Sequence, residues 1–180
     1  MYVSRAAKIP ELMSVIRACI EEGGYEEVSS RMETKNQKRF IDTGFGFPIR
    51  LINVPMVKVR GVWTPKINYN ALALVVLRAL AHKESRLTGN GIKFIRTHFE
   101  LTLQTFAKRF SVTHVAALKW ETGHNQLTAM DWTTEKDIRL FILSKLAARA
   151  DELVQLYNEL VLLPDRKPEP IHLDAQKLVA

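Results

Sequence analysis

Residues 87–123 constrain the fold of this chain most, because they contain three short helical patterns separated by tight breaks. A threonine precedes each pattern, at positions 88, 102 and 113, where its hydroxyl oxygen can cap the free amides of a helix. The second and third patterns, 103–110 and 114–121, flank a turn of three residues at 111–113. Two short helices around such a turn predict a helix-turn-helix.

The side chains of this motif divide into a buried and an outward set. We expect the buried set to include Ala107, Val112, Ala117 and Trp120. The outward set on the third helix is His114, Val115, Leu118 and Lys119. A recognition helix presents such a face to base edges in the major groove. The alternatives are that 87–123 is merely a helical part of the core and that His114 is an ordinary surface histidine.

Positive charge is concentrated in the middle of the chain. The net charge is +7 over 180 residues, with +6 in residues 31–66, +4 in 88–120 and −3 in 121–180. A basic region suggests a polyanionic partner, although a solvated helix face is the alternative for the lysines and arginines. The candidate phosphate contacts are Lys93, Arg96, Thr102, Lys108, Arg109 and Thr113. A secondary basic surface is expected from Lys35, Lys38, Arg39, Lys58 and Arg60.

The N-terminal part begins with a predicted helix at residues 9–22, which Gly23 and Gly24 end. Its apolar stripe contains Cys19, which we interpret as a small buried hydrophobic residue. Because Cys19 is the single cysteine, an internal disulfide and a cysteine-based metal cluster are both excluded.

The next segment, residues 25–44, is polar and basic and has no clear periodicity. Between 48 and 67, short runs rich in β-branched residues predict two or three strands, separated at Pro55. Asn70 can then cap a helix over 71–82, which is apolar on most sides and is therefore expected to be buried.

The C-terminal part is helical in pattern over residues 133–163, starting from the threonine pair at 133–134. We expect it to break into two helices near Ala147 and Ala148. Its apolar stripe fits either core or a subunit contact. Pro164 ends the helix, and the prolines that follow predict a semi-rigid arm over 164–180.

These patterns predict a mainly α protein of the α+β kind. A small α/β domain at 1–83 is expected to precede a helix-turn-helix domain at 84–132, C-terminal helices at 133–163 and a Pro-rich tail. The chain lacks an apolar run long enough for a bilayer and a signal-peptide layout at its start, which indicates a cytoplasmic protein without a membrane partner. No acid–base constellation or Gly-rich phosphate loop is recognisable, so an enzyme is the weakest interpretation.

Two sequence motifs carry a resemblance to a known family. The run Ile52-Asn53-Val54-Pro55 is followed by Leu87-Thr88-Gly89 and then by Ile92, Phe94, Ile95 and Arg96. In these motifs the chain resembles the antitoxins of the MqsA (YgiT-type) group over roughly residues 44–143. From 87 to about 143 it is similar to the Xre-type helix-turn-helix, with Trp120-Glu121-x-Gly123 as the ending of the recognition helix.

The chain departs from that family at three places. The family's N-terminal zinc domain needs paired CxxC motifs, whereas this chain has only Cys19, so we expect no metal and no cofactor. Leu103 stands where the family often has a glutamine that contacts phosphate. Ser111 stands at a turn position often held by glycine, so the backbone there must be strained or the turn must adjust.

The function expected from these features is a sequence-specific transcriptional regulator that represses its own operon as a homodimer on a palindromic operator. His114 and Lys119 could donate to purine N7 or guanine O6, and Val115 could pack on a thymine methyl group. The alternative is a protein–protein module, an adaptor or antitoxin that neutralises a toxin protein, in which DNA binding is secondary.

Overall fold

The computed structural model describes residues 33–146, 149–160 and 170–178. Those residues belong to one compact unit that begins at Glu33. It is mainly helical and contains a small four-stranded sheet, which confirms the expected α+β class. The expected helix at 9–22, with Cys19, and the first residues of the Pro-rich tail lie outside the described residues.

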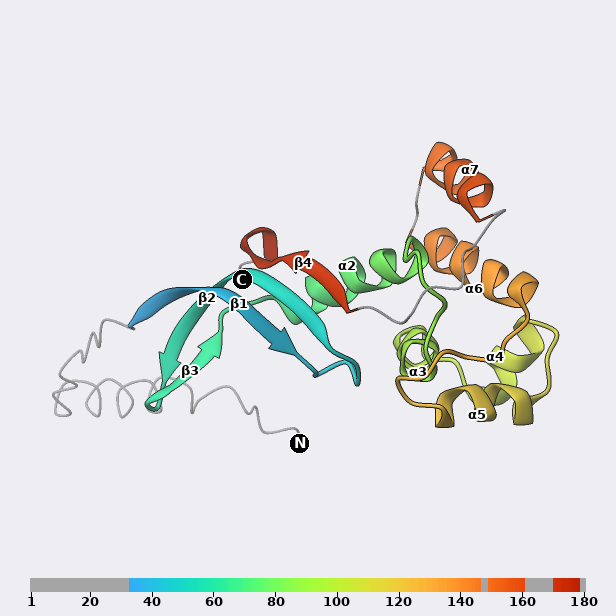
Figure 1. The fold of residues 1–180 in the computed structure, drawn as a ribbon, viewed down its shortest axis with the longest axis horizontal. Helices are drawn as coiled ribbons and strands as arrows, with labels where there is room; N and C mark the ends of the chain where they lie inside the picture. Colours follow the sequence, from blue (N-terminus) through green and yellow to red (C-terminus); the bar gives the residue numbers. More distant parts are fainter. Residues whose placement is uncertain (1–32, 147–148, 161–169, 179–180) are drawn as a thin grey trace, which may run out of the picture. The chain divides into compact units, whose positions relative to one another are not determined.

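The sheet is built around one long central strand (Figure 1). Strand β2 (Ile49–Val59) pairs antiparallel with β1 (Thr34–Asp42) along most of its length. Its other edge is shared by β3 (Val62–Pro65), which is antiparallel, and β4 (Ile171–Asp174), which is parallel. Every other strand of the sheet therefore depends on β2 for its backbone hydrogen bonds.

Strand β2 runs through Pro55, so the expected separation of two strands at this proline is wrong. Pro55 lies between the part of β2 that pairs with β3, beginning at Met56, and the part that pairs with β4, ending at Ile52. Its missing amide is not required there, and its carbonyl oxygen accepts a hydrogen bond from Lys66 N at 2.7 Å. Asn53 has a positive φ of 54°. The buried residues of β2 are at odd positions before it (49 and 51) and at even positions after it (54 and 56), so the alternation shifts by one residue there.

Two strands lie where the sequence predicted no regular structure. Strand β1 occupies positions 34–42 of the segment 25–44, and because six of its nine residues are exposed it carries no alternating apolar pattern. Strand β4 and the 3₁₀ helix η1 (Ala175–Leu178) occupy the end of the expected arm. Ile171, Ala175 and Leu178 are buried against the rest of the core, so this end of the chain is part of the fold rather than a tail.

Helix α2 (Tyr69–Ala81) follows the sheet and packs against α6, β4 and η1. Its N-cap is Asn68 and not Asn70, because the extended backbone of Asn68 lets its side-chain oxygen accept from the Asn70 and Ala71 amides at 3.1 Å. The helix is only partly buried, since Leu74 and Val75 are exposed on one side.

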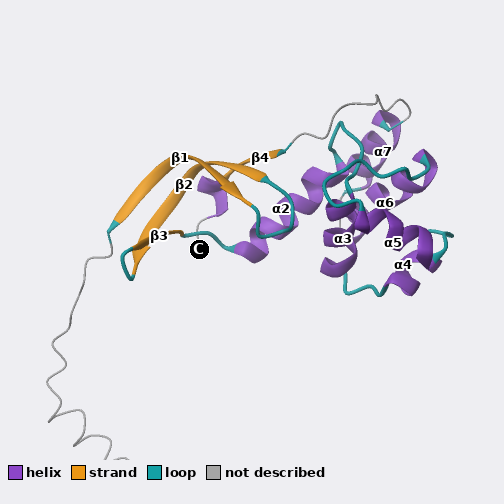
Figure 2. Cartoon of the chain, turned by 60° about the horizontal axis from the view of Figure 1, so that its bottom comes forward, coloured by secondary structure: helices purple, strands orange, loops and turns teal. Residues whose placement is uncertain are grey.

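Four helices follow α2 in the chain before the C-terminal break: α3 (Gly89–His98), α4 (Leu103–Arg109), α5 (His114–Thr122) and α6 (Trp132–Lys145), drawn in purple in Figure 2. The three predicted threonine caps are confirmed, because Thr88, Thr102 and Thr113 each accept a hydrogen bond from the amide three residues ahead at 3.1–3.3 Å. Helix α6 instead starts after Asp131, whose carboxylate accepts from Thr133 N at 2.9 Å. The expected start at the threonine pair is therefore wrong.

The predicted break in the C-terminal helix is confirmed, since α6 ends at Lys145 and α7 (Ala150–Glu159) begins after Arg149. Most of the apolar stripe across these helices is core. Its fully or nearly buried members are Ile138, Phe141, Ile142, Leu156 and Leu160. Val154 and Tyr157 of α7 remain 61% and 52% exposed.

A buried ionic network ties α6 to the segment that leads from α2 into α3. Glu135 and Arg139 are fully buried, and Glu135 accepts hydrogen bonds from Arg139 at 2.8 Å, Arg86 at 2.6 Å and Leu87 N at 2.9 Å. Arg139 also donates to the carbonyl oxygens of Ala81 and Ser85. Burial lowers the pKa of Arg139, and the Glu135 carboxylate opposes this shift.

Candidate nucleic-acid interface

Helices α4 and α5 cross where the sequence places two small side chains. Ala107 and Ala117 are 3% and 0% exposed, and the Val112 amide donates to the Ala107 carbonyl at 2.9 Å in the turn between the helices. Ser111 has a φ of 53°, so it takes the left-handed conformation in place of the glycine common at this point. The two helices therefore have the arrangement of a helix-turn-helix.

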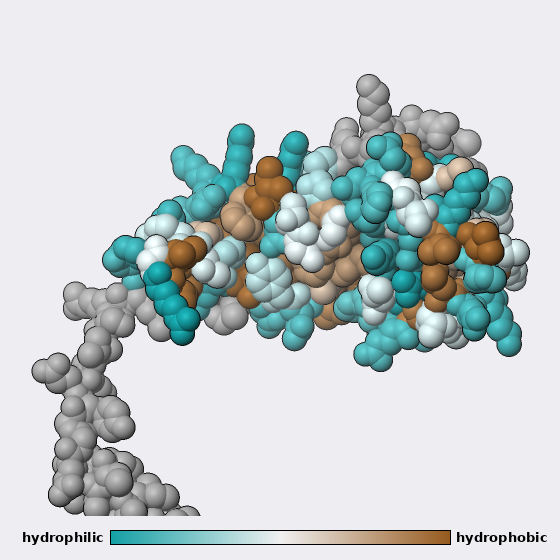
Figure 3. Space-filling view, turned by 90° about the horizontal axis from the view of Figure 1, so that it is seen from below, coloured by the Kyte–Doolittle hydropathy of each residue, from teal (hydrophilic) through white to brown (hydrophobic). Residues whose placement is uncertain are grey.

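The expected recognition face is exposed on α5. His114 and Lys119 are exposed, and Val115 and Leu118 are 60% and 45% exposed. These four residues are spaced so that they form one face of the helix. Helix α5 lies at the lower edge of Figure 1, and this side comes forward in Figure 3, where hydrophobic groups lie among hydrophilic ones.

The carboxylate of α5 is directed away from that face. Glu121 is 7% exposed, and its two oxygens accept from Arg96 Nε at 2.6 Å and Arg96 Nη2 at 2.9 Å. Arg96 Nη1 also donates to the Leu101 carbonyl at 2.8 Å, and the hydrogen bonds to Glu121 raise the pKa of Arg96. The outward face of α5 consequently carries no negative charge.

This pairing corrects the expectation that Arg96 contacts phosphate. Its side chain is 14% exposed, and its guanidinium donates to Glu121 and to a backbone carbonyl, so it holds α3 against α5 instead. Glu121, which holds the helix in place through this pair, was not among the functional residues predicted from the sequence. The available signal was a single acidic residue on a helix that is otherwise neutral or basic. The sequence does not identify its partner, because Arg96 lies 25 residues earlier.

The other candidate phosphate contacts remain on the surface. Lys93 and Lys108 are exposed, and Arg109 is half exposed with Asp137 at 3.5 Å. Thr102 and Thr113 are exposed at the starts of α4 and α5, where their oxygens cap the helices. Thr113 stands at the N-terminal end of α5, where partial positive charge favours an anion.

Backbone contacts hold the two ends of the motif together. The Asn90 amide at the start of α3 donates to the His124 carbonyl at 2.7 Å, and the Gly89 amide donates to the Gln126 carbonyl at 3.2 Å. Gly89 is buried because the last turn of α5 passes directly over it, and a Cβ at this position would overlap the Trp120 carbonyl oxygen. This close approach fixes where α5 ends relative to α3.

The secondary basic surface lies on the three antiparallel strands. Lys35 Nζ is 4.2 Å from the centre of the Trp63 ring, and Lys58 forms an ion pair with Glu33 at 3.0 Å. Three more of the expected residues are exposed: Lys38, Arg39 and Arg60. The sheet therefore brings these five cations into one structural element, although Lys58 is already paired.

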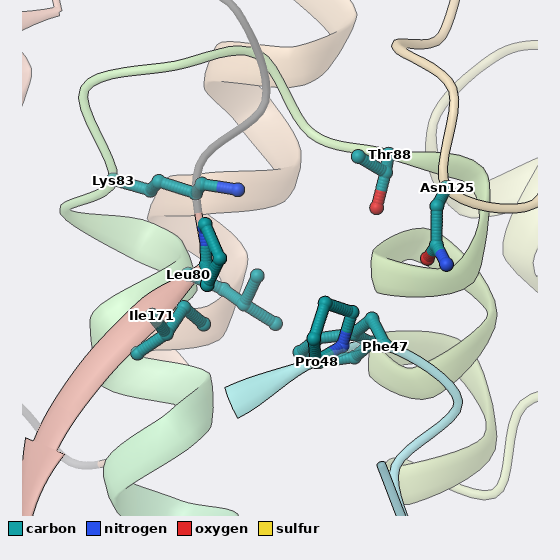
Figure 4. A pocket seen from close by; sticks show the side chains of 8 residues that line it. Phe47, Pro48, Leu80, Lys83, Thr88, Asn125 and Ile171 are labelled. Carbon is teal, nitrogen blue, oxygen red and sulfur yellow. The ribbon is translucent and has the colours of Figure 1, made fainter. Parts of the chain in front are cut away.

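A cavity of about 210 Å³ adjoins the start of α3 (Figure 4). Thr88 and Asn125 lie on one side of it, and Leu80 and Ile171 lie on the other. Because Thr88 is the cap of α3, the cavity is next to the helix-turn-helix motif but does not include the outward residues of α5.

The described residues contain no group of three or more His, Cys, Asp or Glu side chains that could hold a metal ion. None of the helices described combines the length and the apolar character that crossing a bilayer requires. Comparisons with protein-family models, curated proteins and solved structures found no match to this chain.

Proposed function

We propose that the protein is a sequence-specific DNA-binding regulator that inserts α5 into the major groove. The observation that carries this proposal is the outward face of α5, where exposed His114, Val115, Leu118 and Lys119 stand together while Glu121 is turned inward. Hydrogen-bond donors and small apolar groups on a face without carboxylates fit the base edges and thymine methyl groups of the major groove.

Phosphate contacts would come from the residues around this face. Lys93, Lys108 and Arg109 remain exposed, and the capped start of α5 at Thr113 favours an anion. These groups would position the protein, whereas the α5 side chains would read the sequence. The basic strands β1 to β3 would add contacts to the sugar–phosphate backbone that are independent of sequence.

The proposed regulator is a homodimer on an inverted repeat, repressing its own operon. A single short helix reads few base pairs, so two copies are needed for useful specificity. Val154 and Tyr157 on α7 are the exposed apolar residues that support a subunit contact in this region. Light scattering should give a dimer, and Val154→Glu should give a monomer with weaker operator binding. A wild-type monomer that binds one half-site tightly would refute the dimer.

The central experiment compares Lys119→Ala with Lys145→Ala on DNA selected from a random library by the purified wild-type protein. Lys119→Ala should weaken binding to the selected sequence by about 1–3 kcal/mol and relax the preference at one base pair per half-site. Lys145 is an exposed lysine at the end of α6, and its replacement should leave the preference unchanged.

Two outcomes would count against the proposal. If the library yields no preferred sequence, the protein is not a sequence-specific binder. If Lys119→Ala loses affinity equally for selected and random DNA, Lys119 contacts phosphate and α5 does not read bases in the proposed way.

A second candidate function is a protein–protein module that binds a toxin or another partner. It is favoured by an apolar hollow of about 430 Å³ that Leu74 and Val75 of α2 line together with Leu146 and Leu173. Leu74→Glu should abolish capture of such a partner without changing DNA binding. The two functions are therefore separable by mutation.

A further inference from the structure

The hairpin formed by β2 and β3 ends in an unusual tip. Val59 pairs with Val62, so the loop consists of only Arg60 and Gly61. Both have positive φ, 49° for Arg60 and 82° for Gly61, which is the backbone of a tight type I′ turn. Asparagine, aspartate and glycine adopt such a conformation most readily, so the turn itself gives no reason for arginine at the first position.

The chemistry of the tip is apolar and cationic at once. Val59 and Val62 are 49% and 66% exposed. The geometry of the turn does not require apolar side chains at these two positions. Arg60 is exposed and has no hydrogen bond or ion pair within the described part of the chain. No acidic residue occurs from Val59 to Lys66, so no carboxylate of the hairpin itself competes for this guanidinium.

Further positive charge lies just behind the tip. Lys58 and Trp63 are opposite each other in the hairpin, and Lys35 of β1 places its ammonium group over the Trp63 ring at 4.2 Å. Lys58 is 6.0 Å from the centre of the same ring and pairs with Glu33. Behind the arginine at the tip thus lie Lys58, two residues before it on β2, and Lys35 on the neighbouring strand β1.

We propose that the tip of this hairpin inserts into the minor groove of DNA, with Arg60 directed at the groove floor and the two valines against its walls. The inference rests on the proposed DNA-binding function and adds a second site of contact to it. The minor groove is only about 6 Å wide, so a tight turn can direct one long side chain to its floor while the short side chains beside it stay against the walls. Narrow A·T-rich segments concentrate negative potential, which attracts an inserted arginine.

The valines favour the minor groove over a simple phosphate contact. They offer no hydrogen bond to a phosphate oxygen, whereas the walls of the minor groove are deoxyribose rings and apolar side chains commonly enter there. The ligand class of this site is therefore an A·T-rich minor groove flanking or separating the sequences that α5 would read.

The test uses the full chain and a selected operator duplex in two forms. One duplex has ordinary bases, and in the other every adenine is replaced by 2,6-diaminopurine. This base adds an amino group in the minor groove and leaves the donor and acceptor pattern of the major groove unchanged. The wild-type protein should bind the diaminopurine duplex about tenfold more weakly, as expected for loss of one good arginine contact.

Arg60→Asn is the informative variant, because asparagine keeps the positive φ of the turn and removes the charge. It should bind the ordinary duplex about tenfold more weakly than the wild type and should show no further loss on the diaminopurine duplex. Arg50→Gln, at an exposed position near the other end of β2, should remain as sensitive to diaminopurine as the wild type. Unchanged thermal unfolding of both variants should show that the fold is intact.

Val62→Thr replaces an apolar side chain by a polar one of the same shape and should cause a smaller loss on the ordinary duplex. The hairpin proposal is overturned if the wild type binds both duplexes equally, or if Arg60→Asn stays sensitive to diaminopurine. If either result is found while Lys119→Ala still loses affinity for the selected sequence, the α5 proposal stands and only the hairpin proposal fails. Absence of any sequence-specific binding overturns both.

Discussion

The same substitution at two positions of one helix should have opposite effects on stability. Gly89 and Gly91 both lie in the first turn of α3 and both are buried. A Cβ on Gly89 would overlap the Trp120 carbonyl oxygen and lie 3.0 Å from both the nitrogen and the oxygen of His124. All three atoms are backbone, so the end of α5 would have to move as a unit.

At Gly91 the same Cβ would meet only Thr88 Oγ1 at 3.4 Å and Leu80 Cδ2 at 3.7 Å. Those distances are ordinary contacts, and alanine is favoured over glycine within a helix by up to about 1 kcal/mol. We therefore expect Gly91→Ala to be neutral or more stable than the wild type.

Gly89→Ala should be clearly less stable. Forcing extra volume into a packed site typically costs about 1–3 kcal/mol and sometimes more, and a rigid backbone neighbour places this site at the upper end. Together with the gain at Gly91, the two variants should differ by roughly 3 kcal/mol. For a chain of this size the melting temperatures should differ by about 6–12 °C.

Urea unfolding followed by circular dichroism measures this difference directly, with the slope of each transition as the check on two-state behaviour. Free energies of unfolding within about 1 kcal/mol of each other would refute this reasoning, because overpacking at Gly89 should cost more than that. The opposite order would show that α3 and the end of α5 are not in contact. Gly89→Ala should also weaken DNA binding, because the displaced segment is the last turn of α5.

Three further effects should be measurable by the same unfolding assay. Glu135→Gln should lower the free energy of unfolding by about 3–5 kcal/mol because it leaves the buried Arg139 without its ionic partner. Glu152→Gln, which removes the partner of Arg78 in a solvent-accessible pair, should lower it by less than about 1 kcal/mol. Equal losses would mean that the buried network is open to water. Ser111→Gly should stabilise the protein by up to about 1 kcal/mol because the residue has a φ of 53°, and a loss would rule out that conformation. Thr113→Ala should cost about 1 kcal/mol as a lost cap, and Thr133→Ala, which is not the cap of α6, should have a negligible effect.

The helix-turn-helix was predictable because its determinants are local. A threonine cap, a small residue at a crossing and a turn are each encoded within a few positions, so Thr88, Thr102 and Thr113 could be assigned without long-range information. The cap of α2 was misplaced by two residues for a related reason. Asn68 and Asn70 have the same side-chain chemistry, and only the extended backbone of Asn68 distinguishes them.

The parts that the sequence did not predict depend on distant partners. Strand β1 is a polar edge strand, and its pairing with β2 leaves no hydrophobic alternation to recognise. Strand β4 is short and has its partner more than a hundred residues earlier. The role of Arg96 was assigned to phosphate because an exposed arginine on α3 and one paired with Glu121 look the same in sequence.

The position of β4 has a consequence for how the chain reaches its native state. Ile49 pairs with Ile171, so one edge of β2 cannot be completed until the chain has been synthesised as far as β4. At roughly 5–20 residues per second, a ribosome needs several seconds or more to make the intervening segment. Throughout that interval the first half of β2 presents unsatisfied amides and carbonyls beside Ile49 and Leu51. During this time, an extended strand of another molecule could pair with the open edge of β2 in the nascent chain, at the position that β4 later occupies.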